Sequence, residues 1–262
     1  MARNSLLIGV REALMTNNRQ RTGNNRILAF YCRFMAQKQF MPAKIDWPKA
    51  IQPLLKKYKS TKHPLEYKNI YQLVVMVVLS AQSTDVIVNK IAPDLFKVFP
   101  DMKSLAMASP EMLYPYISKV RNFNNKANWL ISIAKSLKTD KNIPLRHESL
   151  TALKGIGSKS ANVILREAGK PAEGVIVDLH VVRVAPRLGI ATGTDPKKIE
   201  TQIKETLPQK DWDAGMAMSF LGREICRPVP KCEICLMKDV CNYYNTVIKK
   251  SSKRSSAKPA KK

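Results

Sequence analysis

Lys159 stands where a lysine could act as a nucleophile. It follows two glycines in the segment LKGIGSKSAN, residues 153–162, and the spacing of apolar residues predicts a helix on each side of these glycines. Lys159 then falls in the first turn of the second helix, where the positive end of the helix dipole disfavours a cation. A neutral lysine amine can attack an electrophilic, carbonyl-like carbon. The alternative is that Lys159 contacts a phosphate as an ordinary solvated charge.

The glycine pair suits a turn that holds an anion. Glycine supplies positive φ cheaply, and Gly155 with Gly157 would let the backbone come close to another molecule. The N–H groups of the turn, and of the helix that begins near Ser158, lack partners inside a helix, and the helix dipole favours negative charge there. Ile156 can fill the gap between the two helices. The segment predicts a helix–turn–helix hairpin that binds phosphate through its backbone; the alternative is a plain helix end followed by an unrelated helix.

A carboxylate lies 19 residues after the lysine. Asp178 stands inside the apolar run EGVIVDLHVVRV, and burying a carboxylate is costly unless it is paired or hydrogen-bonded. Asp178 could cap the helix that starts at Leu179, or it could work beside Lys159 as a base or as a stabiliser of developing positive charge. A helix cap can do both. We interpret His180 as a packed core histidine rather than a ligand.

Four of the five cysteines crowd into 16 residues and predict a metal site. They read C-x5-C-x2-C-x5-C, and they are Cys226, Cys232, Cys235 and Cys241. Such a cluster in a basic, intracellular type of chain favours metal over disulfides. One compact loop suits four thiolates around a 4Fe-4S centre, whereas zinc ribbons usually place two C-x2-C pairs far apart. The spacing alone leaves both metals open. Cys32 stands alone and is interpreted as a spare thiol.

The charge of the chain indicates a polyanionic partner. The net charge is +25 over 262 residues, and the two ends carry much of it. Residues 1–40 hold six arginines and one lysine against one glutamate, and residues 249–262 hold seven basic residues and no acid. The middle is basic as well. This charge attracts nucleic acid most obviously, but by itself does not separate DNA from RNA or from anionic lipid.

The elements that position these residues are predicted to be helices. The run IYQLVVMVVLSA, residues 70–81, is too short to span a membrane and predicts a buried helix. Apolar residues recur at helical spacing in residues 87–99 and 127–137. Ser109 before Pro110, and Asp195 before Pro196, mark two helix starts. No series of strands is evident, so the fold is expected to be all-α.

Taken together, the motifs resemble the endonuclease III family of DNA glycosylases with AP lyase activity. The resemblance covers about residues 42–244 and rests on six segments in order: LSAQSTDVIVNK (79–90), FNNKA (123–127), LKGIGSKSANVIL (153–165), VDLHVVRV (177–184), GREIC (222–226) and the cysteine loop. It implies an all-α fold of two modules with a helix–hairpin–helix and a C-terminal iron–sulfur loop. It also implies a monomer that binds double-stranded DNA containing damaged bases or abasic sites, away from membranes.

The resemblance implies roles for individual residues. Lys159 matches the Schiff-base lysine and Asp178 the active-site aspartate, while Gln82 matches a glutamine that enters the space left by an extruded base. The cysteines match the ligands of a 4Fe-4S cluster, which would order a basic loop containing Arg223 against the DNA backbone. Residues that would grip DNA at the hairpin are Gly155, Ile156, Gly157 and Ser158.

The sequence departs from the family pattern in three places. The first cysteine gap has five residues where the family commonly has six. Arg121 and Asn122 stand where the family usually has a glycine and a wedge-forming leucine, so Asn122 is expected at the DNA but its wedge function is in question. Leu179 replaces a threonine. Two alternatives stay open at this point: a monofunctional mismatch-type glycosylase and a non-catalytic DNA-binding protein.

We expect three segments in the chain, the middle one made of two modules. Residues 1–40 form a basic extension outside the fold, either an over-long start before Met41 or a transit segment. Residues 41–248 form the glycosylase domain, with one module at about 63–171, including the hairpin at 147–166, and a second at about 42–62 plus 172–244. Residues 249–262 are expected to be a disordered tail. The expected location is the bacterial cytoplasm and nucleoid, or a mitochondrion or nucleus if residues 1–40 are a targeting segment.

Overall fold

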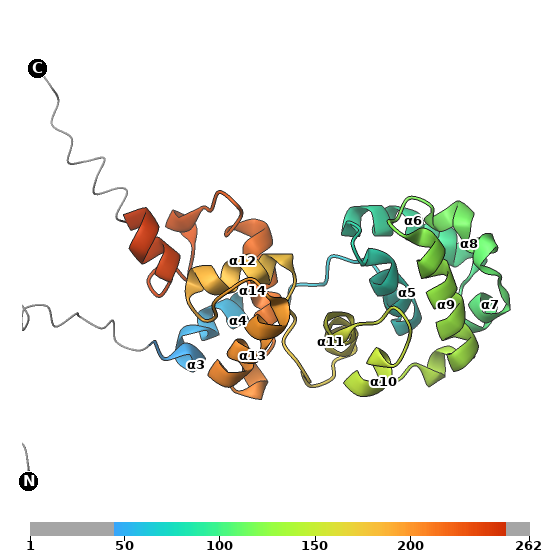
Figure 1. Ribbon diagram of the computed structural model, residues 1–262, viewed down its shortest axis with the longest axis horizontal. Helices are drawn as coiled ribbons and strands as arrows, with labels where there is room; N and C mark the ends of the chain where they lie inside the picture. The colour runs from blue at the N-terminus through green and yellow to red at the C-terminus, as the bar shows by residue number, and fades with distance from the viewer. Residues whose placement is uncertain (1–44, 250–262) are drawn as a thin grey trace, which may run out of the picture. The chain divides into compact units, whose positions relative to one another are not determined.

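The computed structural model describes residues 45–249, and these residues form helices and loops without a strand (Figure 1). The all-α prediction is thereby confirmed. The described helices belong to one compact unit that begins at Asp46. None of them is both long and apolar enough to cross a membrane. The predictions for residues 1–40, for Cys32 and for the tail beyond Lys249 fall outside the described residues.

The helices follow one another through short loops. The α-helices are α3 (Trp47–Ala50), α4 (Gln52–Tyr58), α5 (Ile70–Ser80), α6 (Asp85–Val98), α7 (Met102–Met107), α8 (Pro110–Ile117), α9 (Phe123–Leu137), α10 (His147–Thr151), α11 (Ser158–Glu167), α12 (Leu179–Leu188), α13 (Pro196–Thr206) and α14 (Ala214–Glu224). Short 3-10 turns span Asp140–Asn142, Gln209–Asp211 and Cys232–Ile234, and a π-helical turn spans Tyr244–Ile248.

One group of helices packs around α5. This helix contacts α6, α9 and α11, while α7 and α8 pack on α9, and α10 pairs with α11 (Figure 1). Its residues from Leu73 to Leu79 are all buried, as the apolar run predicted, because a helix that is apolar on every side must be covered on every side. This packing fixes the C-terminal end of α5 and the start of α11, which position two of the candidate site residues, Gln82 and Lys159.

A second group packs around α14. This helix contacts α12 and α4, and α12 also contacts α13 (Figure 1). Close packing requires small residues here: a Cβ on Gly215 would come within 2.4 Å of the carbonyl oxygen of Ile176, and one on Gly222 within 2.8 Å of His180. The segment before α12 therefore lies directly against α14, which brings Asp178 and the end of α14 together.

The predicted helix starts are found where the sequence marks them. Asp195 caps α13 by accepting a hydrogen bond from the Lys198 N–H at 2.9 Å, and Pro196 is its first residue. Ser109 precedes α8 and Pro110 begins it, although the Ser109 side chain makes no capping hydrogen bond. Sequence signals for helix starts thus hold even where the expected side-chain bond is absent.

Candidate active-site cleft and cysteine loop

A cleft of about 1090 Å³ gathers the predicted catalytic residues. Four of its lining residues are Gln82 from the loop after α5, Lys159 at the start of α11, Asp178 before α12 and Arg223 near the end of α14. A deeper pocket of about 220 Å³ is lined by the same four side chains. Residues distant in sequence therefore meet at one place, as the motifs predicted for Lys159, Asp178 and Gln82.

Lys159 is placed so that its amine faces the cleft. It is the second residue of α11, directly after the hairpin turn, and its side chain is exposed. Within residues 45–249 it forms no hydrogen bond or ion pair, so no neighbouring group occupies its lone pair once it is deprotonated. Its charge nonetheless acts on Asp178, which shows that the two groups are close enough to interact. The Lys159 amine is thus unpaired within residues 45–249 and shares the cleft with the Asp178 carboxylate.

Asp178 is a largely buried, ionised helix cap. Its Oδ1 accepts hydrogen bonds from the N–H groups of His180 and Val181, both at 2.9 Å, and its Oδ2 accepts one from the Ser219 hydroxyl at 2.6 Å. Burial by itself raises the pKa of Asp178, but the bonds from Ser219 and Val181, with the charge of Lys159, bring the pKa below its ordinary value. The capping prediction and the catalytic interpretation are therefore compatible, because the cap keeps a carboxylate in the cleft.

Arg223 lies in the cleft rather than among the basic residues of the cysteine loop. Its Nη1 pairs with Asp85 Oδ2 at 3.0 Å, and its Nη2 lies 3.8 Å from Asp178 Oδ2. Its Nε is buried and has no hydrogen-bond partner within the described residues. By contrast Arg227 and Lys231, two basic residues of the cysteine loop, are exposed. The guanidinium therefore lies beside two carboxylates of the cleft, those of Asp85 and Asp178.

The loop that carries Gln82 is held by a buried lysine that the sequence analysis did not single out. Gln82 adopts a left-handed conformation, with φ 56°, and is exposed to the cleft. Lys126, which is 2% exposed, donates hydrogen bonds to the carbonyl oxygens of Leu79 (2.8 Å) and Ala81 (2.6 Å) and to the Ser83 hydroxyl (3.4 Å). These bonds satisfy the C-terminal end of α5, so the unusual backbone of Gln82 is imposed by its surroundings.

Asn122 adopts a left-handed conformation at the start of α9, with φ 60° and ψ 36°. Its Oδ1 accepts a hydrogen bond from Asn125 Nδ2 at 2.9 Å, which folds the side chain back along the helix. Arg121 and Lys119 line the cleft next to this position, and the Arg121 N–H donates to Ser83 at 3.0 Å. The segment is thus joined to the Gln82 loop, while the Asn122 side chain itself is turned toward α9.

The predicted hairpin is formed by α10, α11 and the turn between them. Gly155 has φ +85°, and a Cβ there would come within 2.6 Å of the Trp129 ring, so this position requires glycine. Ile156 is 4% exposed and fills the space between the helices, as expected. The N–H groups of Gly157 and Ser158 donate no hydrogen bond within residues 45–249, which leaves them available to an anion.

Gly157 corrects one expectation. The glycine pair suggested a turn with positive φ, but Gly157 has a φ of −91°, which is open to any residue, and a Cβ there would meet nothing within 4 Å. Gly157 is the N-cap residue of α11, where glycine is a favoured type, and its open surface also leaves room for another molecule to approach. The two glycines of the motif therefore have different roles, one inside the fold and one at its surface.

Alanine substitutions at Gly155 and Gly157 are predicted to have different effects, one on stability and the other on DNA binding. Gly155→Ala should destabilise the fold by more than the roughly 1–2 kcal/mol of a left-handed alanine, because Trp129 must also move. Gly157→Ala should melt close to wild type yet bind an abasic duplex more weakly. Thermal melting and fluorescence anisotropy measure the two effects. Equal melting temperatures for the two variants would contradict the assignment.

The four cysteines lie in the loop after α14 and line one apolar cavity. None of the four forms a disulfide. Arginines of α12 hold the loop in place: Arg187 donates to the carbonyl oxygens of Arg227 (2.7 Å) and Pro228 (3.0 Å), and Arg183 donates to that of Cys226 (3.0 Å). The loop is therefore anchored to the same helix that Asp178 caps.

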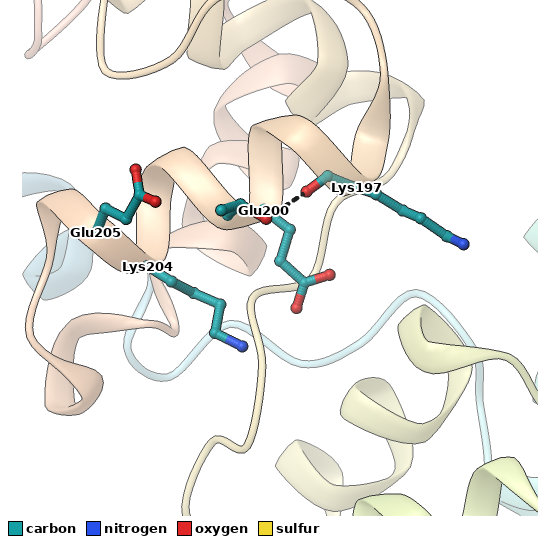
Figure 2. Close-up of a pocket in the computed structure, with 5 residues that line it drawn as sticks. Lys197, Glu200, Lys204 and Glu205 are labelled. Atoms are coloured by element: carbon teal, nitrogen blue, oxygen red, sulfur yellow. Dashed lines mark hydrogen bonds between the residues drawn. The ribbon is translucent and has the colours of Figure 1, made fainter.

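A further hollow lies along α13 and carries no candidate chemistry (Figure 2). Its lining residues all belong to this one helix, where lysines and glutamates alternate on the surface: they are Lys197, Glu200, Thr201, Lys204 and Glu205. It contains none of the predicted site residues. We interpret it as a solvated helix face.

Comparison with known proteins decides the family. Residues 75–209 match the HhH-GPD superfamily of base excision DNA repair proteins. Endonuclease III from Synechocystis is 35% identical over 192 residues, which cover 72% of this chain and 88% of the relative. Endonuclease III from Escherichia coli is 30% identical over 207 residues, covering 76% and 97%. The chain belongs to the endonuclease III family.

Solved structures of endonuclease III agree with this membership. A non-covalent endonuclease III–DNA complex superposes with a TM-score of 0.68 at 28% identity, covering 77% of this chain and 96% of the other. A trapped covalent endonuclease III–DNA intermediate gives a TM-score of 0.67, covering 76% and 96%. This endonuclease III family member is an enzyme of base excision repair, a DNA glycosylase with AP lyase activity, and the two alternative functions considered from sequence are less well supported.

Proposed function

We propose that this endonuclease III family member removes oxidised pyrimidines from double-stranded DNA with Lys159 as the nucleophile, and then cleaves the strand 3′ to the abasic site by β-elimination. The observation that carries the proposal is the shared cleft, where the unpaired Lys159 amine faces the ionised Asp178 carboxylate. An exposed lysine amine that lines the same cleft as an active-site carboxylate can act as a nucleophile toward an electrophilic carbon. DNA binding is supported by the DNA complexes of the structural relatives.

In the proposed reaction a damaged base leaves the stack and enters the deeper pocket. The neutral Lys159 amine forms a bond to C1′ of the deoxyribose while the bond from C1′ to the base breaks, and the base leaves after gaining a proton. Asp178 stabilises the positive charge that develops on the sugar, since its lowered pKa keeps it a carboxylate near neutral pH. The bound nitrogen then loses a proton while the C1′–O4′ bond breaks and O4′ gains a proton, which opens the sugar ring and gives a Schiff base at C1′. The Schiff base withdraws electrons, so a proton is lost at C2′, the C3′–O bond breaks and the 3′ phosphate departs.

DNA is proposed to contact three parts of the chain. The free N–H groups of Gly157 and Ser158 would hold a phosphate, Gln82 would enter the gap left by the base, and Asn122 would lie at the edge of that gap. Arg223 would act from within the cleft by balancing Asp178. The enzyme would work as a monomer, and the bacterial origin of the relatives supports a location in the cytoplasm and nucleoid.

The division of the chain is also a proposal. The contacts of α5 to α11 with one another, and of α3, α4 and α12 to α14 with one another, support two modules with the cleft residues drawn from both. The proposed boundaries are 63–171 for the first module and 42–62 plus 172–244 for the second. Residues 1–40 and 249–262 would then add charge rather than fold.

The cysteine loop is proposed to hold a 4Fe-4S cluster. Burial raises the pKa of the Cys232, Cys235 and Cys241 thiols, and the neighbouring thiols raise it further, so the thiols are protonated when the cavity is empty. A positively charged metal group in the cavity would lower these pKa values and favour the thiolates that bind it. Among residues 45–249 no three or more His, Cys, Asp or Glu side chains converge as the ligands of a single metal ion do. Zinc ligands converge on one point, whereas cluster thiolates bind four different irons around a cavity. The cluster would order the loop and take no part in the bond-breaking steps.

The metal assignment leads to a measurable composition. Protein purified without oxygen should be yellow-brown, absorb broadly in the violet and contain about four irons per chain. Cys235→Ser should lose the iron and lower the melting temperature, while Cys32→Ser, the matched control at the fifth cysteine, should keep both. Metal analysis and absorption spectra provide the measurement. Stoichiometric zinc without iron would contradict the cluster.

A nicking assay tests the proposed function as a whole. A duplex with one abasic site, and another with one thymine glycol, are incubated with the protein and resolved before and after alkali. The proposal predicts cleavage of both duplexes without alkali. Base release that needs alkali to reveal a break would instead indicate a monofunctional glycosylase, and binding without either reaction would indicate a non-catalytic protein.

A further inference from the structure

We propose that His63 recognises the extruded base in the deeper pocket by donating a hydrogen bond from its Nε2–H to a carbonyl oxygen of that base. This inference rests on the proposed function, because it concerns the same pocket. It adds a residue that lies outside every motif segment considered above and that nothing in the local sequence distinguishes. The reason for choosing it is its place in the pocket wall.

The pocket that His63 lines is suited to one small ring. Its volume of about 220 Å³ corresponds to roughly seven water molecules at about 30 Å³ each, which is enough for a pyrimidine. Val77, Val163, Ile176 and Met216 supply apolar walls. Lys159 and Asp178 lie at the same pocket, so a base inside it would have its sugar beside the reacting amine.

The hydrogen bond that His63 already makes defines what the ring can offer. Its Nδ1 accepts from the Leu65 N–H at 3.1 Å, so in the neutral ring the proton is on Nε2. Burial lowers the pKa of His63 to about 4, and the charges of Lys159 and Arg223 lower it too, against opposing effects of Glu167 and Asp85. The ring is therefore neutral at physiological pH and presents a donor, which matches a base carbonyl and does not match a base amino group.

The segment that carries His63 is fixed from α6. Asn89 donates from Nδ2 to the Pro64 carbonyl oxygen at 2.9 Å and accepts from the Glu66 N–H at 3.0 Å. Leu65, between these two residues, is 2% exposed. The chain directly after His63 is thus anchored, and the Leu65 N–H holds the ring at Nδ1, so the ring does not need to be ordered when a base enters. A preorganised donor is the kind of group that gives specificity in a small pocket.

The test separates base recognition from strand cleavage. His63→Phe keeps the bulk of the ring but has no donor, and His63→Gln restores an N–H near the place of Nε2. Under single-turnover conditions His63→Phe should release thymine glycol about 10-fold more slowly than wild type. It should cut a duplex with a preformed abasic site at the wild-type rate, because that site has no base to contact. His63→Gln should recover most of the loss.

Two results would overturn the proposal. One is an unchanged rate of thymine glycol release in His63→Phe, and the other is an equal loss on the lesion and abasic duplexes, which would indicate a structural role. A measurement of DNA binding decides the question even if the variant releases no base. Duplexes with a 2′-fluoro thymine glycol nucleotide or a tetrahydrofuran site are compared, and His63→Phe should weaken only the first. Wild-type protein that cuts neither reactive duplex would instead refute the proposed function.

Discussion

Lys159→Gln should lower strand cleavage of an abasic duplex by roughly 10⁴-fold or more, as expected when a covalent nucleophile is removed. Glutamine keeps the length and polarity of the side chain but has no nucleophilic amine. Because Lys159 is exposed and unpaired within residues 45–249, the substitution should leave the melting temperature unchanged. Gel-based single-turnover cleavage and borohydride trapping are the measurements.

The matched control for this variant is Lys154→Gln. Lys154 is an exposed lysine of the same hairpin and does not line the cleft. The Lys154→Gln substitution removes one positive charge from the same surface as Lys159→Gln. Any loss of DNA affinity that is due to charge alone should therefore be similar in the two variants. Only Lys159→Gln should lose trapping. Borohydride trapping that persists in Lys159→Gln would show that another amine is the nucleophile. The role of the hairpin would then be limited to binding a DNA phosphate.

Asp178→Asn should slow base release by about 10²–10³-fold while DNA binding is retained. Asparagine is a good helix cap and can still accept from the His180 and Val181 N–H groups, so α12 should stay formed. What is lost is the negative charge that stabilises the sugar cation and balances Arg223. Single-turnover kinetics and thermal melting separate the chemical effect from the structural one.

Asp101→Asn provides the corresponding control at a cap remote from the cleft. Asp101 accepts from the Ser104 N–H at 2.7 Å at the start of α7 and lines neither pocket. This variant should show any general cost of changing a capping aspartate without changing the reaction rate. A wild-type rate of base release in Asp178→Asn, with the protein folded, would assign Asp178 to the helix cap alone.

The fold could be predicted from the sequence because its signals are local. The run from Ile70 to Ala81 predicted a buried helix, and α5 is buried around its whole circumference. Asp195 and Pro196 predicted the start of α13. Lys159 and Asp178 could be singled out since each stands at a helix start, and the structure brings both to one cleft.

The remaining features depend on contacts between distant elements. Arg223 resembled a surface residue near the cysteines, and only the packing of α14 reveals that it faces Asp85 and Asp178. The difference between Gly155 and Gly157 depends on the position of Trp129. Lys126 offered a signal that was overlooked, because it lies on the buried face of α9 at helical spacing with Leu130 and Ala134. His63 offered none.

The central claim is that the Lys159 amine forms the covalent bond to DNA. The most direct measurement is borohydride reduction of wild-type protein on a duplex with one abasic site, followed by proteolysis and mass spectrometry of the cross-linked peptide. The account predicts a single reduced sugar adduct on Lys159. An adduct on any other lysine or on the chain's N-terminal amine would contradict it, as would the absence of an adduct while the strand is cleaved.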